Sequence, residues 1–107
     1  MKPHLSPLEI MAISAFTRSV RERFGARVER LSLFGSRARG EGREESDLDL
    51  FIAIRGMTRD DRLEVIDAAA DVGVEHGLAL SPLVVDPSTW REDLPIAGNI
   101  ARDGVPL

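Results

Sequence analysis

The sequence contains no cysteine and only two histidines among its 107 residues. A chain without cysteine cannot form a disulfide framework, a thiolate zinc site, an iron–sulfur cluster or a cysteine nucleophile. His4 lies near the N-terminus and His76 near an expected helix end, so a histidine-rich metal site or a Ser-His-Asp triad would depend on His76. A partly exposed histidine near a helix C-terminus is the simpler interpretation of His76.

Long apolar runs are also missing. No segment approaches the roughly 20 apolar residues that a membrane span needs, and residues 1–10 lack the basic and apolar regions of a signal peptide. We therefore expect a cytoplasmic protein. With 43% hydrophobic residues, the sequence predicts one domain over residues 1–107 with a single core.

Aromatic residues make up only 5% of the chain, and the formal net charge is −4. Residues 1–40 carry eight bases and three acids, whereas residues 41–107 carry six bases and fifteen acids. An acidic portion that is not a tail is consistent with a cation site. The chain lacks the basic face and stacking aromatics that bind nucleic-acid strands, so direct nucleic-acid binding is disfavoured.

Two long helices are predicted. The first begins at Ser6-Pro7-Leu8-Glu9, a capping sequence, and ends before Gly25. The second begins with the capping arrangement of Thr58 and Asp61 and runs to about Glu75. Apolar residues at helical spacing are expected to form its buried face: Leu63, Ile66, Ala70 and Val74. Shorter helical segments are predicted over residues 36–39, 88–94 and 96–102.

Three strands are predicted, over residues 28–34, 47–54 and 78–85. The second strand is continuously apolar after Asp49, as expected where both faces of a sheet are covered. Pro82 places the third strand at an edge or a bulge, and Trp90 is interpreted as a packing residue. The order of elements predicts an α/β (α+β) fold, a small mixed sheet with helices packed against it.

Asp47 and Asp49 are the first candidates for a functional role. Two residues apart on a strand, they project from the same face with Cα atoms roughly 6.5 Å apart. Two ionised carboxylates so close are costly unless a cation compensates, and Mg²⁺ prefers such oxygen ligands together with substrate phosphates. The alternative is an ordinary strand junction in which these aspartates pair with nearby arginines: Arg37, Arg39 or Arg43.

Gly35-Ser36 follows a different predicted strand. Glycine allows close backbone approach to a ligand, and the following amides with the Ser36 hydroxyl could hold a phosphate. A lone Gly-Ser pair means little, but here ten residues separate Ser36 from Asp47 and its partner Asp49. Those four positions would fall together by chance in roughly one in a thousand chains of this size.

The segment Leu33-Phe34-Gly35-Ser36-Arg37-Ala38-Arg39-Gly40, followed by Ser46-Asp47-Leu48-Asp49-Leu50, resembles the signature of the DNA polymerase β-like nucleotidyltransferases, specifically the minimal nucleotidyltransferase (MNT) domains. The tight match covers residues 33–52. The resemblance implies a polymerase β-like fold and transfer of a nucleoside monophosphate, most simply AMP from ATP, to a hydroxyl of a protein or small-molecule acceptor, with pyrophosphate leaving.

The resemblance also implies roles for single residues. Gly35 and Ser36 would hold the β- and γ-phosphates, and Asp47 and Asp49 would hold the Mg²⁺ ions. Two metals in such a site steady the attacking and leaving oxygens of an in-line displacement. Two arginines, Arg37 and Arg39, would contact the triphosphate or else pair with acids of the following loop: Glu41, Glu44 and Glu45.

Members of the family with the full catalytic set carry a third acid on a neighbouring strand. Here Ser81 or Pro82 occupies the expected position, and the nearest carboxylates are Glu75 and Asp86. Asp86 is the candidate for the third acid, although a turn residue before Pro87 is the plainer interpretation, as a solvated helix residue is for Glu75.

Two functions of different class follow. The first is a Mg²⁺-dependent nucleotidyltransferase with a relaxed third ligand. The second is a catalytically weak or inactive fold that binds a partner protein, because MNT domains resemble the antitoxin half of pairs with a small helical HEPN ribonuclease. AMP transfer or occlusion would each neutralise such a toxin. A homodimer through the long helices is a further expectation.

Overall fold

The structure is a computed structural model, which describes residues 4–41 and 47–107. Its helices are α1 (Pro7–Phe24), α2 (Gly35–Ala38), α3 (Arg59–His76) and α4 (Pro95–Asp103), with a 3-10 turn over Gly25–Arg27 after α1. Its strands are β1 (Val28–Phe34), β2 (Leu48–Ile54), β3 (Leu80–Val85) and β4 (Val105–Pro106).

The four strands form one mixed sheet in the order β3-β2-β1-β4. β1 is antiparallel to β2 and to β4, whereas β2 and β3 run parallel because α3 connects them. β3 therefore lies at an edge, which confirms the position that Pro82 predicts. β4 was not predicted, because its two residues carry no strand periodicity.

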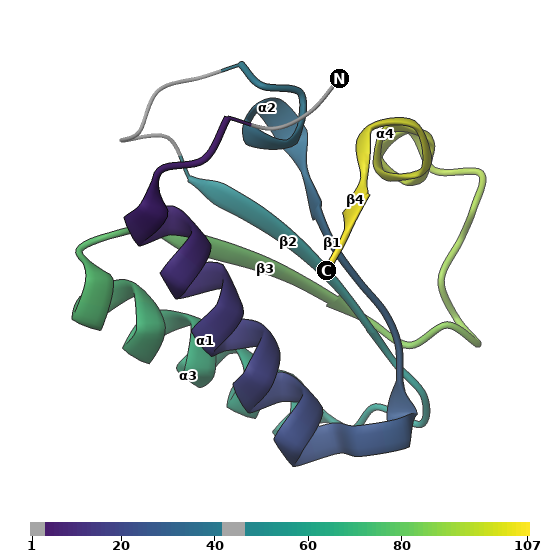
Figure 1. The fold of residues 1–107 in the computed structure, drawn as a ribbon. Helices are drawn as coiled ribbons and strands as arrows, with labels where there is room; N and C mark the ends of the chain where they lie inside the picture. Colours follow the sequence, from purple (N-terminus) through teal and green to yellow (C-terminus); the bar gives the residue numbers. More distant parts are fainter. Residues whose placement is uncertain (1–3, 42–46) are drawn as a thin grey trace.

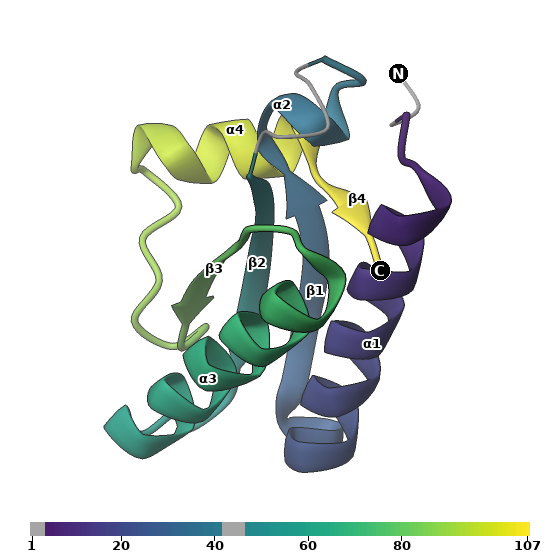
Figure 2. The same cartoon turned by 90° about the vertical axis from the view of Figure 1, so that its left-hand side faces the viewer.

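The two faces of the sheet are covered differently. α1 and α3 lie side by side on one face, and α4 lies on the other, near the end where β1 leads into α2 (Figure 1). The view in Figure 2 shows α3 and α1 in front of the strands and α4 crossing behind them. The predicted fold class is confirmed. None of the described helices combines the length and apolarity that crossing a bilayer requires.

The predicted helix starts are confirmed. The Ser6 hydroxyl accepts from the Glu9 amide at 3.1 Å, and the Glu9 carboxylate accepts from the Ser6 amide at 2.8 Å. Thr58 and Asp61 form the same reciprocal arrangement at the start of α3. Such capping boxes satisfy amides that have no partner within the helix, and this is why the local sequence marks these positions.

The predicted buried face of α3 is wrong. Small or β-branched residues are buried instead: Val65, Ala69, Val72 and Gly73. The predicted residues point outward, with Val74 84% exposed. A methyl group on Gly73 would lie 2.6 Å from the Leu78 carbonyl oxygen, so the chain after α3 passes too close for a larger residue. The face of α3 that is buried is the one whose side chains fit the narrow space beside it, and not the one with the largest apolar side chains.

The segment between β3 and α4 contains turns rather than the helical turn predicted over residues 88–94. Asp86 organises this segment, because its backbone carbonyl accepts from the amides of Thr89 and Trp90. The Trp90 ring packs against Phe51 with ring centres 5.4 Å apart, so its predicted packing role is confirmed.

Candidate functional site

Gly35 and Asp49 lie against each other at neighbouring strand ends. Phe34, the last residue of β1, pairs with Asp49 on β2, so the next residue along the chain meets the Asp49 side chain. Gly35 has a φ of +78°, and a methyl group there would lie 2.3 Å from Oδ2 of Asp49. Glycine is therefore required here both for the backbone conformation and for the space that the carboxylate occupies.

Asp49 projects from the sheet face opposite α1 and α3. Its neighbours Leu48 and Leu50 pack into the core on the helix-covered side, and strand alternation turns Asp49 to the other side with Phe51. Asp47 precedes β2 and is exposed. Burial raises the pKa of Asp49, the charge of Asp47 raises it further, and Arg39 partly offsets both. A cation bound beside the two aspartates would stabilise the ionised form of Asp49.

Arg37 lies in the protein interior, with a partner that the sequence did not suggest. The residue is 5% exposed, and its guanidinium donates to both carboxylate oxygens of Glu9, at 2.6 and 2.7 Å. It also donates to the His4 carbonyl at 3.0 Å. Arg37 therefore ties α2, which begins at Gly35-Ser36, to the start of α1, and its side chain is committed to this ion pair rather than directed at a phosphate.

Glu9 is fully buried, yet it is held in its charged form. Burial alone would raise the pKa of Glu9, but the Ser6 amide and the Arg37 guanidinium outweigh it, so the pKa lies below its ordinary value. The capping box accounts for Glu9 in the sequence, and 28 residues separate it from Arg37, so no local pattern links the two. This positioning pair is what sequence reasoning missed.

The side chain of Arg39 is 39% exposed and stands near the site. It donates to Glu41 at 3.2 Å and to Asp103 of α4 at 3.1 Å. Pairing with Glu41 was one of the two expectations for this residue. Arg43, Glu44 and Glu45, the other predicted participants in this loop, lie outside the described residues.

The structure corrects the expectation for Asp86. Ser81 is the residue of β3 that pairs with Asp49, and Asp86 lies five residues further along, roughly 16 Å away at the opposite end of the strand. Its carboxylate accepts from the amide and hydroxyl of Ser88 at 2.9 and 2.8 Å and from the Met57 amide at 3.2 Å. Asp86 is a turn residue, not a member of this site.

Exposed Ser81 thus occupies the place beside Asp49. Glu75 is exposed on α3, and His76 of the same helix makes a 2.8 Å contact between its Nδ1 and the Val72 carbonyl. Across residues 4–41 and 47–107, no group of three acidic or histidine side chains is gathered for a metal. Two carboxylates do fit Mg²⁺, which usually takes one or two carboxylates together with substrate phosphates.

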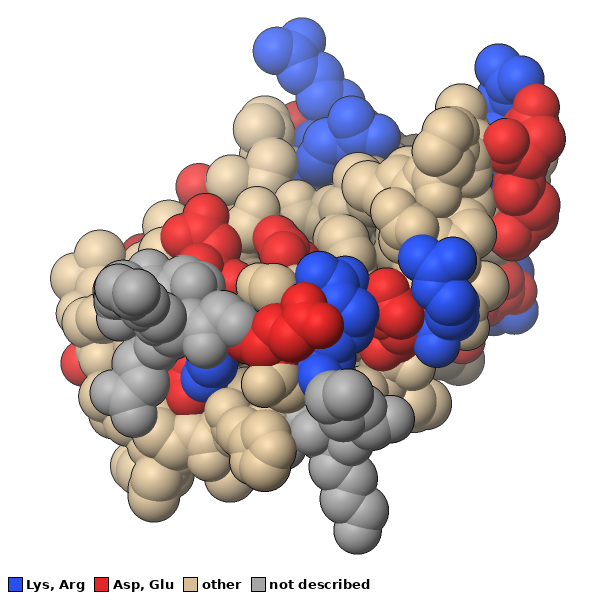
Figure 3. All heavy atoms as spheres, turned by 90° about the horizontal axis from the view of Figure 1, so that it is seen from above, with Lys and Arg blue, Asp and Glu red and all other residues tan. Residues whose placement is uncertain are grey.

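The surface around the site carries charges of both signs. Figure 3 looks onto the end of the molecule that carries α2 and shows acidic and basic side chains next to one another. This mixture differs from the continuous basic stripe that binds a phosphate backbone.

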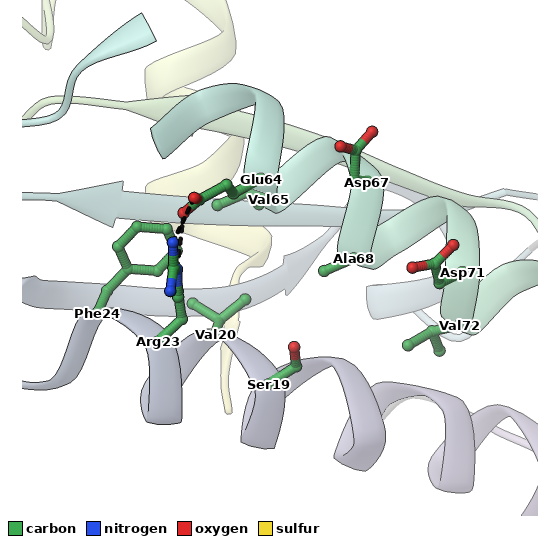
Figure 4. A pocket seen from close by; sticks show the side chains of 10 residues that line it. All are labelled: Ser19, Val20, Arg23, Phe24, Glu64, Val65, Asp67, Ala68, Asp71 and Val72. Atoms are coloured by element: carbon green, nitrogen blue, oxygen red, sulfur yellow. Dashed lines mark hydrogen bonds and ion pairs between the residues drawn. The ribbon is translucent and has the colours of Figure 1, made fainter. Parts of the chain in front are cut away.

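A separate groove of about 340 Å³ runs between α1 and α3, on the other face of the sheet. In Figure 4, Arg23 and Glu64 are joined across it, while Val20, Val65 and Val72 line its interior. The groove shares no residue with the Gly35–Asp49 contact, and its floor belongs to the core between the two helices.

The mixed sheet and the aspartates beside Gly35-Ser36 define a minimal nucleotidyltransferase domain. A family model for the nucleotidyltransferase domain matches residues 13–93, and the chain belongs to this family. "Putative protein adenylyltransferase MJ0604" of Methanocaldococcus jannaschii is 33% identical over 86 residues, covering 80% of this chain and 82% of that protein.

Two solved structures have the same fold. One, "Structure of putative minimal nucleotidyltransferase", is 29% identical with a TM-score of 0.61, covering 97% of this chain and 98% of its own. The other, "Crystal structure of the toxin-antitoxin with AMP-PNP", is 15% identical with a TM-score of 0.60, covering 85% of this chain and 68% of its own. The second likeness concerns the fold alone.

Proposed function

We propose that this chain is a Mg²⁺-dependent adenylyltransferase that moves AMP from ATP to a hydroxyl of an acceptor. The observation that carries the proposal is the contact between Gly35 and Asp49, which brings the Gly-Ser turn and the aspartates to one point. Kinship with an adenylyltransferase-named relative and the fold of a toxin–antitoxin complex with AMP-PNP support the choice of nucleotide.

In this proposal Gly35 and Ser36 bind the β- and γ-phosphates, and Asp47 and Asp49 hold the metal. Bound Mg²⁺ would neutralise the charge that develops on the transferred phosphoryl group and on the leaving pyrophosphate. Arg39 is exposed enough to turn from Glu41 toward the triphosphate. Arg37 has a different role: through Glu9 it fixes the position of α2 and hence of the phosphate-binding turn.

The acceptor oxygen forms the new bond to the α-phosphorus while the bond from that phosphorus to the pyrophosphate oxygen breaks, and the proton of the acceptor hydroxyl passes to solvent. Ser81 stands beside Asp49, and a neutral hydroxyl cannot take the acceptor's proton as a carboxylate would. Ser81→Asp is therefore expected to raise the transfer rate if the missing acid limits it. An unchanged rate would show that proton removal is not limiting.

The acceptor hydroxyl can belong to another protein that binds beside this small domain. We propose a HEPN-type toxin as that acceptor, because solved toxin–antitoxin complexes share this fold. The reaction would take place in the cytoplasm, where ATP is abundant. A homodimer is also part of the proposal, and light scattering on the purified chain tests it directly.

The deciding experiment is a transfer assay with labelled ATP and Mg²⁺, with and without the product of the neighbouring reading frame. The Asp47→Asn/Asp49→Asn double variant is the comparison, and Asp86→Asn is the matched control outside the site. Label on the partner that disappears only in the double variant would establish the enzyme. Absence of label with wild-type protein would overturn it.

A second candidate function is partner binding without catalysis, and the serine at position 81 is the observation that favours it. A stable complex with the partner that forms equally well with the double variant, and without label transfer, would establish this function in place of the first.

A further inference from the structure

The outer side of α3 carries a row of apolar side chains. This outer stripe consists of the four residues that the sequence predicts to be buried and the structure exposes: Leu63, Ile66, Ala70 and Val74. They are spaced by three or four positions, so they lie above one another on one side of the helix. Contiguous apolar side chains on a surface, unlike single ones, mark a place where another molecule binds.

A hollow of about 580 Å³ lies beside the C-terminal half of the outer stripe, between α3 and the start of β3. It is lined by residues 69–70, 73–74 and 77–80, none of which is charged. Ala70 and Val74 belong to both the outer stripe and the hollow, so the two form one apolar surface. The hollow reaches Leu80, and the next residue, Ser81, is exposed and pairs with Asp49. A molecule bound here therefore stands at the strand edge next to the candidate site.

An acidic row borders the outer stripe on the side away from the hollow. Asp67 and Asp71 are exposed and each lie three residues before a member of the stripe, so their carboxylates flank it. In Figure 4 both carboxylates point away from α1. Among the described residues neither makes an ion pair. Like charges four residues apart destabilise a helix, so a cation supplied from outside would be stabilising here.

A second copy of the chain does not supply that cation. In an antiparallel two-fold pair of α3 helices the same flank of each copy meets, and the two acidic rows would lie against one another. In a parallel pair the acidic row of each copy would lie over the uncharged hollow of the other. Charge complementarity therefore favours a different molecule, with basic side chains beside its apolar ones. The proposed homodimer would then use another face of the protein.

We infer that the outer stripe, the hollow and the acidic row bind an amphipathic helix of a partner protein, whose apolar stripe is flanked by lysine or arginine. Helices that dock in this way use apolar anchors at the same three- and four-residue spacing. The inference rests on the proposed function, because it assigns the surface and the chemistry of the partner that brings the acceptor. Since α3 covers the sheet face opposite Asp49, the bound helix leaves the Gly35–Asp49 contact open.

Two synthetic helical peptides as long as α3 test the inference by calorimetry. Both carry leucine at helical spacing, with lysines beside the leucines in one and glutamates in the other. Neither contains a hydroxyl side chain, so their binding is independent of AMP transfer, and failure here is distinct from failure of the transfer assay. We expect saturable one-to-one binding of the lysine peptide only. No binding of the lysine peptide, or equal binding of both, would overturn the inference.

A pair of matched variants tests the apolar part of the surface. Ile66→Gln should weaken binding of the lysine peptide about ten-fold, as loss of one buried anchor does. Ile96→Gln is the control, because Ile96 on α4 is 40% exposed against 42% for Ile66, and binding should stay within about two-fold of wild type. Equal losses would place the peptide elsewhere and overturn the inference, as would a dimer, seen by light scattering, that Ile66→Gln dissociates.

A second pair tests the charges. Asp67→Lys/Asp71→Lys should weaken binding of the lysine peptide about ten-fold and allow the glutamate peptide to bind. Glu22→Lys/Glu92→Lys changes the net charge by the same amount at exposed positions outside this surface, and should leave both peptides as they are with wild type. Thermal melts check that each variant folds. The same loss in both double variants would mean that only the net charge matters, and would overturn the inference.

Discussion

The two faces of the sheet differ in what covers them, although the same strands build both. On one face β2 contributes Leu48, Leu50 and Ile52 to a continuous apolar core beneath two 18-residue helices. On the other face it contributes Asp49, Phe51 and Ala53, beneath a nine-residue helix and a turn-rich segment. Burial of apolar side chains on the first face supplies most of the folding free energy. The second face can therefore accommodate a cavity and the partly buried carboxylate of Asp49, whose ionised form is destabilised by burial.

The buried pair Glu9–Arg37 ties α2, and with it the Gly35-Ser36 turn, to α1 on the first face, so breaking it should have the largest effect. Arg37→Met leaves the Glu9 carboxylate buried without its cation and should cost about 3–5 kcal/mol of unfolding free energy, measured by urea denaturation. Replacing both residues, as Glu9→Gln/Arg37→Met, should recover part of that loss. A double variant as unstable as Arg37→Met would contradict this account of the pair.

The same pair makes a prediction for pH. Because the pKa of Glu9 is lowered in the folded protein, its stabilisation is complete above the ordinary glutamate pKa and is lost as pH falls through the folded value. The difference in unfolding free energy between wild type and the double variant should shrink in this acidic range. Denaturation at a series of pH values measures it.

Gly35→Ala tests the contact that defines the site. The variant combines strain at a φ of +78° with a methyl group 2.3 Å from Asp49 Oδ2, and should cost about 2–3 kcal/mol and abolish MgATP binding. Gly56→Ala is the matched control: its φ is +64°, nothing lies within 4 Å of the added methyl, and about 1 kcal/mol is expected with binding intact. Equal effects of the two variants would argue against a special role for the carboxylate contact.

Asp49→Asn should separate stability from function. Burial and Asp47 raise the pKa of Asp49, so the stability of the ligand-free protein falls as pH rises from the ordinary aspartate pKa through the raised folded value, and the loss is complete above it. The variant should be more stable than wild type near pH 7, by about 1 kcal/mol or less, and lose Mg²⁺-dependent nucleotide binding. Thermal melts at pH 7 and at acidic pH, where the gain should vanish, provide the check.

The smallest effect is expected on the outer side of α3. Val74→Ser should change the unfolding free energy by no more than about 0.5 kcal/mol, because the side chain is 84% exposed. Val65→Ala, at a fully buried position of the same helix, should cost more than 1 kcal/mol. If Val74→Ser cost more stability than Val65→Ala, the buried face of α3 would be the one that apolar periodicity predicts.

The features that could be predicted from sequence are those with local causes. Capping boxes at Ser6 and Thr58 mark helix starts, and the apolar run after Asp49 marks a strand covered on both faces. The spacing of the Gly35-Ser36 and Asp47-Asp49 pairs predicts the candidate site, and strand pairing does bring Gly35 against Asp49. Glu9–Arg37, the position of Asp86 and the buried face of α3 depend on strand register and close packing between distant segments, which no local pattern contains.

Pro82 on the outermost strand has a consequence beyond its position. An edge strand offers unpaired backbone groups to any other chain, and proline, without an N–H, removes one donor from that row. Since β3 pairs directly with the strand that carries Asp49, an added strand from another molecule would lie close to the site. The proline therefore helps to keep this edge of the sheet from becoming a seed for intermolecular sheet growth and aggregation.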